Sequence, residues 1–448
     1  MSDPANEPSF RLEVAGQPDA FEVQAFTGSE SISEPFAFDL DLLIADPQLD
    51  LANLLYRSAW LSFGREGQGI HGHLQEVEQR EHGESARHCR VRLGPRLSCL
   101  GLRISQRMFT ACSVPQIIDQ VLGEHGIVGR ARSFELERHY PAQDFCTQYR
   151  ESDLAFVQRL CAQAGIHYHF RHRRQGHCLV LSDGQASFDP GPQVRFEVGD
   201  GPSAVGQFQV SGSLGLVGLE QPPARMAEGS GHVAALRSGQ WMALSGHPIA
   251  EWNQLWLLTR IEHSGSPDTY RNRFWASPAD APFIAAQPLA KPRMDSLQRA
   301  WVVAVDDDVA PAAEPRIAVQ FDWLYQGEGA ARSHCWLPLA PELGQLPLDQ
   351  GTEVLVSFIE GDPDQPLISG LLTTPSTLTV EQVAPCESTA AAFASDTAPA
   401  PDALVKLLQA SPPLVLLCLL PGGGSFSQCG EAVCTCRMLT TFNGNGAA

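Results

Sequence analysis

Short runs of alternating apolar and polar residues dominate positions 9 to about 110, and Gly, Pro and Asp separate these runs. A two-residue period places one face of an extended strand against a core and the other face in water. Turn-forming residues between the runs favour antiparallel connections. The first quarter of the chain is therefore predicted to form antiparallel β-strands.

Two segments change to the period of a helix. The first begins at Ser113, where Gln116 completes a capping box, and it weakens at Gly123 and Gly126. The second runs from about residue 152 to 164 and stops before a glycine. Its predicted buried face consists of residues three and four positions apart: Leu154, Val157, Leu160, Cys161 and Ala164. Strands are expected to resume at 166–170 and 178–181, so the fold class is predicted to be mainly β with a few helices.

The later part of the chain has two different patterns. Residues 188 to 231 are rich in Gly, Pro and Ser, and only 205–210 and 214–219 have the composition of strands. Residues 354–372 contain two alternating runs around a turn that extends from Glu360 to Pro366. This second pattern predicts a hairpin of the kind that closes a small β-barrel.

The order and spacing of several segments resemble the VgrG family, the spike proteins of type VI secretion systems, which are related to the tail hubs of contractile phages. The strongest match is residues 140–166, which begin Tyr140-Pro-Ala-Gln-Asp-Phe-Cys and end Ala-Gln-Ala-Gly-Ile166. The other matching segments are 23–43, 70–78, 270–274 with 278–283, 317–323, 335–337 and 354–372. The chain departs from the family in three places: the stretch between Phe208 and Leu236 is short, the turn at 312–317 lacks the family's glycine, and the long Val and Gly repeat of a C-terminal needle is missing.

The resemblance implies phage tail-hub-like β-barrel subdomains followed by a small OB-fold barrel. The expected hub covers residues 9–284, with strands from 9–110 and 182–284 around a helical and strand insert at 111–181. A linker is expected at 285–297, the OB-fold barrel at 298–373, an Ala- and Pro-rich linker at 374–403, and a short apolar, Cys-containing tail at 404–448.

The same resemblance implies a structural role without enzymatic activity or a cofactor. We expect a homotrimer that caps an Hcp-like ring of the inner tube and presents a PAAR-type tip or an effector. A cytoplasmic adaptor that loads effectors, keeping the hub fold without the needle, is the alternative. The oligomeric state of the protein and its export would distinguish the homotrimeric spike from the adaptor.

Charge and hydropathy limit the partners further. The chain has 31 Lys and Arg against 51 Asp and Glu, a formal charge of −20. This balance disfavours nucleic acid and anionic membrane surfaces. No run of 18 apolar residues is present, and the first seven residues lack the features of a signal peptide. We therefore expect that the protein does not insert into a membrane by itself. We also expect it to be cytoplasmic during assembly and to be exported through the injection apparatus.

Three clusters are candidate sites. Cys429, Cys434 and Cys436 follow a Gly-rich turn and form a candidate metal site, although packing of a strand tip explains them as well. The short tail also has candidate partner-binding residues, which are apolar and lie between two prolines: Leu414, Leu416, Leu417 and Leu420. The third cluster crowds one hairpin, where either a metal pair or a hydrated strand face is possible: His167, His169, His172 and His177. No set of nucleophile, base and orienting group emerges from the sequence.

Overall fold

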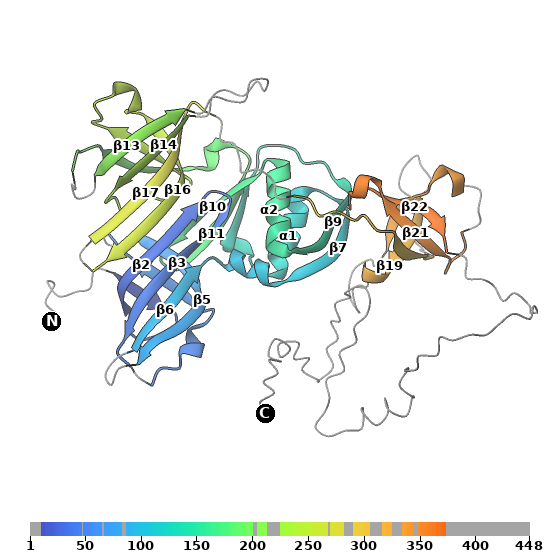
Figure 1. Cartoon of the computed structure of the whole chain (residues 1–448), viewed down its shortest axis with the longest axis horizontal. Coiled ribbons are helices and arrows are strands. Elements are labelled where there is room, and N and C mark those ends of the chain that lie inside the picture. The colour runs from blue at the N-terminus through green and yellow to red at the C-terminus, as the bar shows by residue number, and fades with distance from the viewer. Residues whose placement is uncertain are drawn as a thin grey trace, which may run out of the picture. The chain divides into compact units, whose positions relative to one another are not determined.

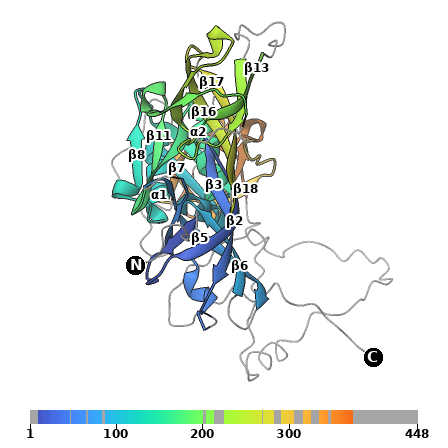
Figure 2. The same cartoon turned by 90° about the vertical axis from the view of Figure 1, so that its left-hand side faces the viewer.

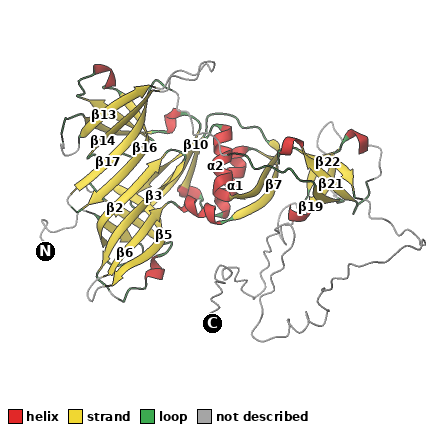
Figure 3. Cartoon of the chain, viewed as in Figure 1, coloured by secondary structure: helices red, strands yellow, loops and turns green. Residues whose placement is uncertain are grey.

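The computed structural model describes residues 10–46, 48–64, 67–82, 87–199, 204–212, 225–267, 269–281, 290–304, 316–324, 334–343 and 348–372. Backbone contacts divide the chain into two compact units. The first comprises Met1–Ser105 and Phe109–Pro292, and the second comprises Gln106–Met108 and Arg293–Ala448. Strands dominate both units, which confirms the predicted mainly β class (Figure 3). Within the described residues, no helix is long and apolar enough to cross a bilayer.

Six strands of the first unit close into a barrel, here called the first barrel. Its strands follow each other around the barrel in the order β1 (Arg11–Val14), β4 (Ser58–Ser62), β5 (Gly69–His82), β6 (Arg87–Gly94), β3 (Glu34–Ile44) and β2 (Phe21–Ser31). The ring closes because β1 also pairs with β2, with Leu12 opposite Phe21. Alternate residues of β3, including Phe38 and Leu40, are fully buried inside it, as the two-residue period predicts.

Six further strands form a second barrel. Their order is β12 (Asp189–Arg195), β15 (Gln240–Ser245), β16 (Leu255–Ser266), β17 (Thr269–Pro278), β14 (Arg225–Gly231) and β13 (Val205–Gly212). A bridge between Phe196 and Val205 connects the end of β12 to the start of β13. The strand expected at 205–210 corresponds to β13, whereas 214–219 lies outside the described residues. Despite the short segment before Leu236, the described part of this subdomain contains as many strands as the first barrel.

The two barrels share one continuous sheet (Figure 1). Strand β2 of the first barrel pairs antiparallel with β16 of the second, with Gly28 opposite His263. Gly28 is required at this position, because a Cβ atom would lie 2.1 Å from Cδ1 of Phe38. The connection between the barrels is therefore hydrogen-bonded backbone, and we refer to this β2–β16 pairing as the junction.

The insert, residues 109–182, packs against the first barrel. It contains α1 (Val114–Glu124), β8 (Arg132–Glu135), β9 (Gln143–Ser152), α2 (Asp153–Ala164), β10 (His167–Arg173) and β11 (Gly176–Ser182). Strand β7 (Ile104–Cys112) pairs with β9, and β8 lies beside β11 (Figure 2). The rings of Phe36 in β3 and Phe170 in β10 meet edge to face at 5.0 Å, so the barrel and the insert share one apolar core.

Both helices begin close to the predicted positions, and α1 has the predicted cap. The N–H group of Ser113 donates to Oε1 of Gln116 at 2.8 Å in the capping box of α1. Ser152 caps α2 by accepting from the N–H group of Ala155, and α2 ends at Gly165, whose φ is 68°. The buried face of α2 differs slightly from the prediction. Phe156, Val157, Leu160 and Cys161 are buried, whereas Leu154 and Ala164 are only half-buried.

The second unit contains a small five-stranded barrel. Its order is β20 (Cys335–Pro338), β19 (Arg316–Phe321), β18 (Gln298–Val302), β21 (Glu353–Phe358) and β22 (Pro366–Leu371). A bridge between Leu339 and Ile368 connects the two ends of this order. Strands β21 and β22 form the hairpin predicted from the sequence, and Glu360 and Gly361 have positive φ in its turn.

Within the described residues, the short 3-10 helices lie in the connections between the longer elements. They are Leu51–Leu54, Arg96–Leu102, Gly129–Ala131, Gln185–Ser187, Ala250–Trp252, Asp322–Leu324, Pro341–Leu343 and Ile359–Gly361.

Candidate interaction face at the barrel junction

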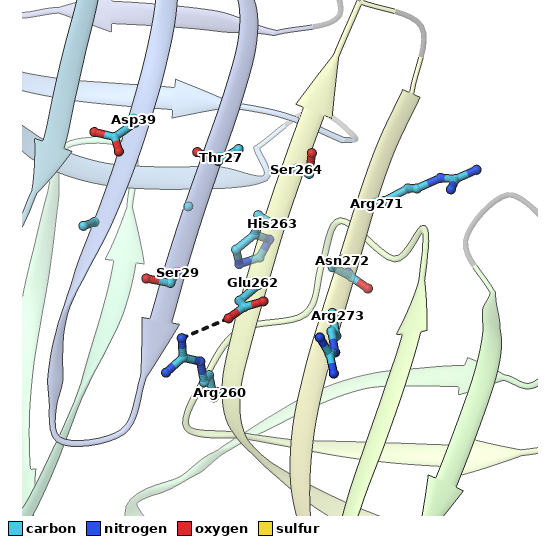
Figure 4. A pocket seen from close by; sticks show the side chains of 12 residues that line it. Thr27, Ser29, Asp39, Arg260, Glu262, His263, Ser264, Arg271, Asn272 and Arg273 are labelled. Atoms are coloured by element: carbon cyan, nitrogen blue, oxygen red, sulfur yellow. Dashed lines mark hydrogen bonds and ion pairs between the residues drawn. The ribbon is translucent and has the colours of Figure 1, made fainter.

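An open hollow of about 550 Å³ lies over the junction of the two barrels (Figure 4). Strands β2, β3, β16 and β17 all contribute to it. The residues that line it are Thr27, Gly28, Ser29, Ala37, Asp39, Arg260, Glu262, His263, Ser264, Arg271, Asn272 and Arg273. Because both barrels supply residues, the hollow exists only when β2 and β16 pair in this register.

The strand period separates the open face of the hollow from its floor. On β16, Arg260 and Ser264 are exposed and Glu262 is half-buried, whereas Ile261 and His263 are buried. On β17, Arg271 and Arg273 are exposed, whereas Asn272 and Phe274 are buried. The open face is consequently polar and charged.

Charged side chains on the open face form solvent-accessible pairs. Nη2 of Arg260 lies 2.9 Å from Oε1 of Glu262, and Nη2 of Arg273 lies 2.5 Å from Oε1 of Glu228 in β14. The guanidinium carbons of both arginines also lie over the ring of Trp275, at 5.5 and 4.9 Å from its centre. Exposed pairs of this kind stabilise a fold by only about 0 to 1 kcal/mol. These side chains can therefore exchange their present partners for those of another surface at little cost.

The floor of the hollow is a buried polar network. Nε2 of His263 lies 2.9 Å from Oε1 of Glu30, and its Nδ1 lies 2.7 Å from the hydroxyl group of Tyr270. That hydroxyl group also accepts from Nδ2 of Asn272 at 3.2 Å. Burial lowers the pKa of His263, against the opposing effect of Glu30, and burial raises the pKa of Tyr270 above its ordinary range. A neutral imidazole that donates to Glu30 and accepts from Tyr270 satisfies both ring nitrogens of His263.

The network supports the junction and shows no sign of nucleophilic chemistry. Glu30, His263 and Asn272 are 2 to 4% exposed, so substrate cannot reach them. The raised pKa of Tyr270 keeps its hydroxyl group protonated. The described geometry is that of a rigid polar floor below a charged face that can contact another protein surface.

The sequence-predicted candidates lie elsewhere. The tail candidates Cys429, Cys434, Cys436 and Leu414 through Leu420 are outside the described residues. The interpretation of the histidine hairpin as a hydrated strand face is wrong for His167 and His169, which are 4% and 1% exposed, whereas His172 and His177 are half-buried. The insert packs this hairpin against the rest of the first unit, which alternation alone does not reveal.

The junction hollow was not predicted from the sequence. Its polar positions follow the strand alternation of 260–264 and 271–273, which is the available signal. That signal shows that one face is polar, but it does not show that β16 pairs with β2. Only the pairing makes the polar positions of two barrels into one surface.

Comparisons with known proteins agree with this architecture. A family model described as phage tail baseplate hub (GPD) matches residues 29–214. The type VI secretion system spike proteins VgrG4b and VgrG5 of Pseudomonas aeruginosa are each 35% identical to the chain over 83% of its length. The chain belongs to the VgrG family.

The chain spans 57% and 58% of the length of these two VgrG relatives. Among solved structures, the E. coli c3393 protein has a TM-score of 0.68 at 24% identity, and the match covers 81% of this chain and 99% of that one. Its published description names it a component of the type VI secretion system with structural similarity to the phage T4 tail proteins gp27 and gp5. A chain of the lidded Francisella PdpA-VgrG complex has a TM-score of 0.56 at 6% identity. These two likenesses support the hub fold.

Proposed function

We propose that this VgrG chain is the hub and spike of a type VI secretion apparatus and acts as a homotrimer. The observation that carries the proposal is the pair of six-stranded barrels joined edge to edge through β2 and β16. Three copies around one axis would present six barrels. Such a ring would match an inner tube built from Hcp-like hexameric rings, so a trimer can cap a sixfold structure.

The junction face supplies a physical basis for contacts within or beyond the trimer. A cyclic trimer uses heterologous contacts, in which one surface meets a different surface of its neighbour. With a formal charge of −20 on each chain, association requires local charge complementarity. The arginines Arg260, Arg271 and Arg273 give the junction face positive groups that can meet acidic groups of a neighbour or of the tube.

The proposed role is structural, with no reaction carried out by the described residues. In it, the C-terminal end of the chain carries a tip protein or an effector, and the assembled spike leaves the cytoplasm through the apparatus. The two six-stranded barrels and the small barrel support the structural role. The relatives described as type VI secretion system spike proteins support export through the apparatus.

Light scattering of the purified full chain tests the trimer. We expect a particle with three times the 48.6 kDa chain mass at micromolar concentration. The double variant Arg271→Glu with Arg273→Glu should lower the trimer fraction or abolish binding to tube rings, while Arg195→Glu, on an exposed arginine away from the hollow, should change neither. A monomer at every salt concentration, together with absence from the medium of secreting cells, would refute the spike and favour the adaptor.

A further inference from the structure

Four histidines gather where the insert meets the first barrel. His71 and His73 belong to β5, and His172 and His177 belong to β10 and β11. Nδ1 of His71 lies 2.9 Å from Nδ1 of His177, although the two residues are 106 positions apart in the chain. The cluster therefore connects the barrel and the insert directly.

Three of these rings have the spacing of ligands on one metal ion. The ring centres of His71, His73 and His177 are 5.1, 5.7 and 5.8 Å apart. Three imidazoles that bind one Zn²⁺ through bonds of ~2.0 to 2.1 Å place their ring centres about 5 to 6 Å apart. Two nitrogens on a tetrahedral ion are about 3.3 Å apart, so the Nδ1 pair needs to open by only a few tenths of an ångström.

The protonation state and orientation of the rings also suit a metal. Burial lowers the pKa of His71 to about 4 and that of His177 to about 3, so both are neutral at pH 7 and offer lone pairs. The hydroxyl group of Ser58 lies 2.7 Å from Nε2 of His71 and directs the opposite nitrogen toward His177. Nδ1 of His73 is buried and makes no hydrogen bond. This atom lacks the partner that a buried polar group ordinarily has.

We propose that His71, His73 and His177 form a binding site for a divalent transition-metal ion, with Zn²⁺ as the preferred ion. In the present arrangement of the side chains, the described residues contain no group of three His, Cys, Asp or Glu side chains that could hold a metal ion. Binding therefore requires the ring of His73 to turn toward the Nδ1 pair. The adjoining cavity of about 200 Å³ has room for a water molecule as the fourth ligand. The ion would join β5 of the barrel to β11 of the insert.

One charged residue opposes this site. Arg96 lines the same cavity, where burial is the main cause of the lowered pKa of His73 and of His177 and the charge of Arg96 adds to it. The same charge repels a bound cation. Arg96→Gln should therefore bind Zn²⁺ about 3- to 10-fold more tightly than the unaltered chain, a change that a purely structural cluster gives no reason to expect.

Metal titration of the full chain tests the proposal. Because the tail cysteines are alternative ligands, the background is the full chain with Cys429→Ser, Cys434→Ser and Cys436→Ser, treated with a chelator and dialysed. We expect one equivalent of Zn²⁺ to bind and to raise Tm by roughly 5 °C at saturation. Co²⁺ should give the visible absorption of a tetrahedral nitrogen site without thiolate bands.

Variants decide whether the named histidines are the ligands. In that background, His73→Gln should lose both the bound equivalent and the rise in Tm, while its Tm without metal stays close to that of the background. His169→Gln, which changes a buried histidine outside the three, should keep both. Binding that survives in His73→Gln, or no binding of Zn²⁺ and Co²⁺ by the background, would overturn the proposal. These outcomes do not depend on the trimer or on export.

Discussion

His169 provides a direct test of the buried hairpin, because it should make the protein sensitive to acid. The residue is 1% exposed, and the structure shows no hydrogen-bond partner for either ring nitrogen. Burial, the nearby charge of Arg171 and the neighbouring His167 lower its pKa to about 3. The perturbation is His169→Asn, which removes the titrating group and keeps a small polar side chain.

The size of the effect follows from proton linkage. The unfolded histidine has a pKa of about 6.5, so between pH 6.5 and about 3 the unfolded state binds a proton that the folded state does not. Stability is therefore fully present above pH 6.5 and falls as the pH is lowered. At pH 5 the loss from this one residue is about 1.4 kcal/mol multiplied by 1.5 pH units, or about 2 kcal/mol.

Urea unfolding at pH 7 and pH 5 measures this effect, with the protein concentration held constant because association also affects stability. We expect the decrease in unfolding free energy between the two pH values to be about 2 kcal/mol smaller in His169→Asn than in the unaltered chain. The matched change at the exposed His139 should leave the decrease unaltered. A variant that loses as much stability as the unaltered chain would show that His169 takes up its proton in the folded state, and the burial argument would be wrong.

Two further changes test the packing of the first unit. Leu160→Asp places a carboxylate at a position that is 2% exposed, so it should lower the free energy of unfolding by several kcal/mol, enough to make the protein insoluble. Leu154→Asp, at the half-buried end of α2, should lower it less. Equal solubility and equal melting curves for the two variants would contradict the observed buried face of α2. Gly28→Ala should lower stability by about 1 to 3 kcal/mol, because its Cβ would overlap the ring of Phe38 on the neighbouring strand β3, while Gly123→Ala in α1 should raise stability slightly. Calorimetry that finds no loss in Gly28→Ala would argue against the observed packing of Phe38 on Gly28.

Features set by short stretches of sequence were predictable. The cap at Ser113, the start of α2 near residue 152, the stop at Gly165 and the hairpin of 354–372 all appear where the sequence places them. Each depends on residues within a few positions, since caps and turns satisfy hydrogen bonds of neighbouring backbone groups. The mainly β class and the family resemblance also follow from the order of such local patterns, and the comparisons confirm both.

The closure of the barrels and the identity of the candidate sites depend on tertiary structure. Glu30 and His263 are 233 positions apart and meet only because β2 pairs with β16, and His71 meets His177 only because the insert packs on the first barrel. Alternation tells that one face of a strand is buried, but many strands offer equivalent edges and faces. The choice among them comes from packing and hydrogen bonding over whole sheets, where a shift of one residue would turn every side chain to the wrong face. For that reason the sequence could identify the histidine hairpin, while only the fold could show that His167 and His169 are buried.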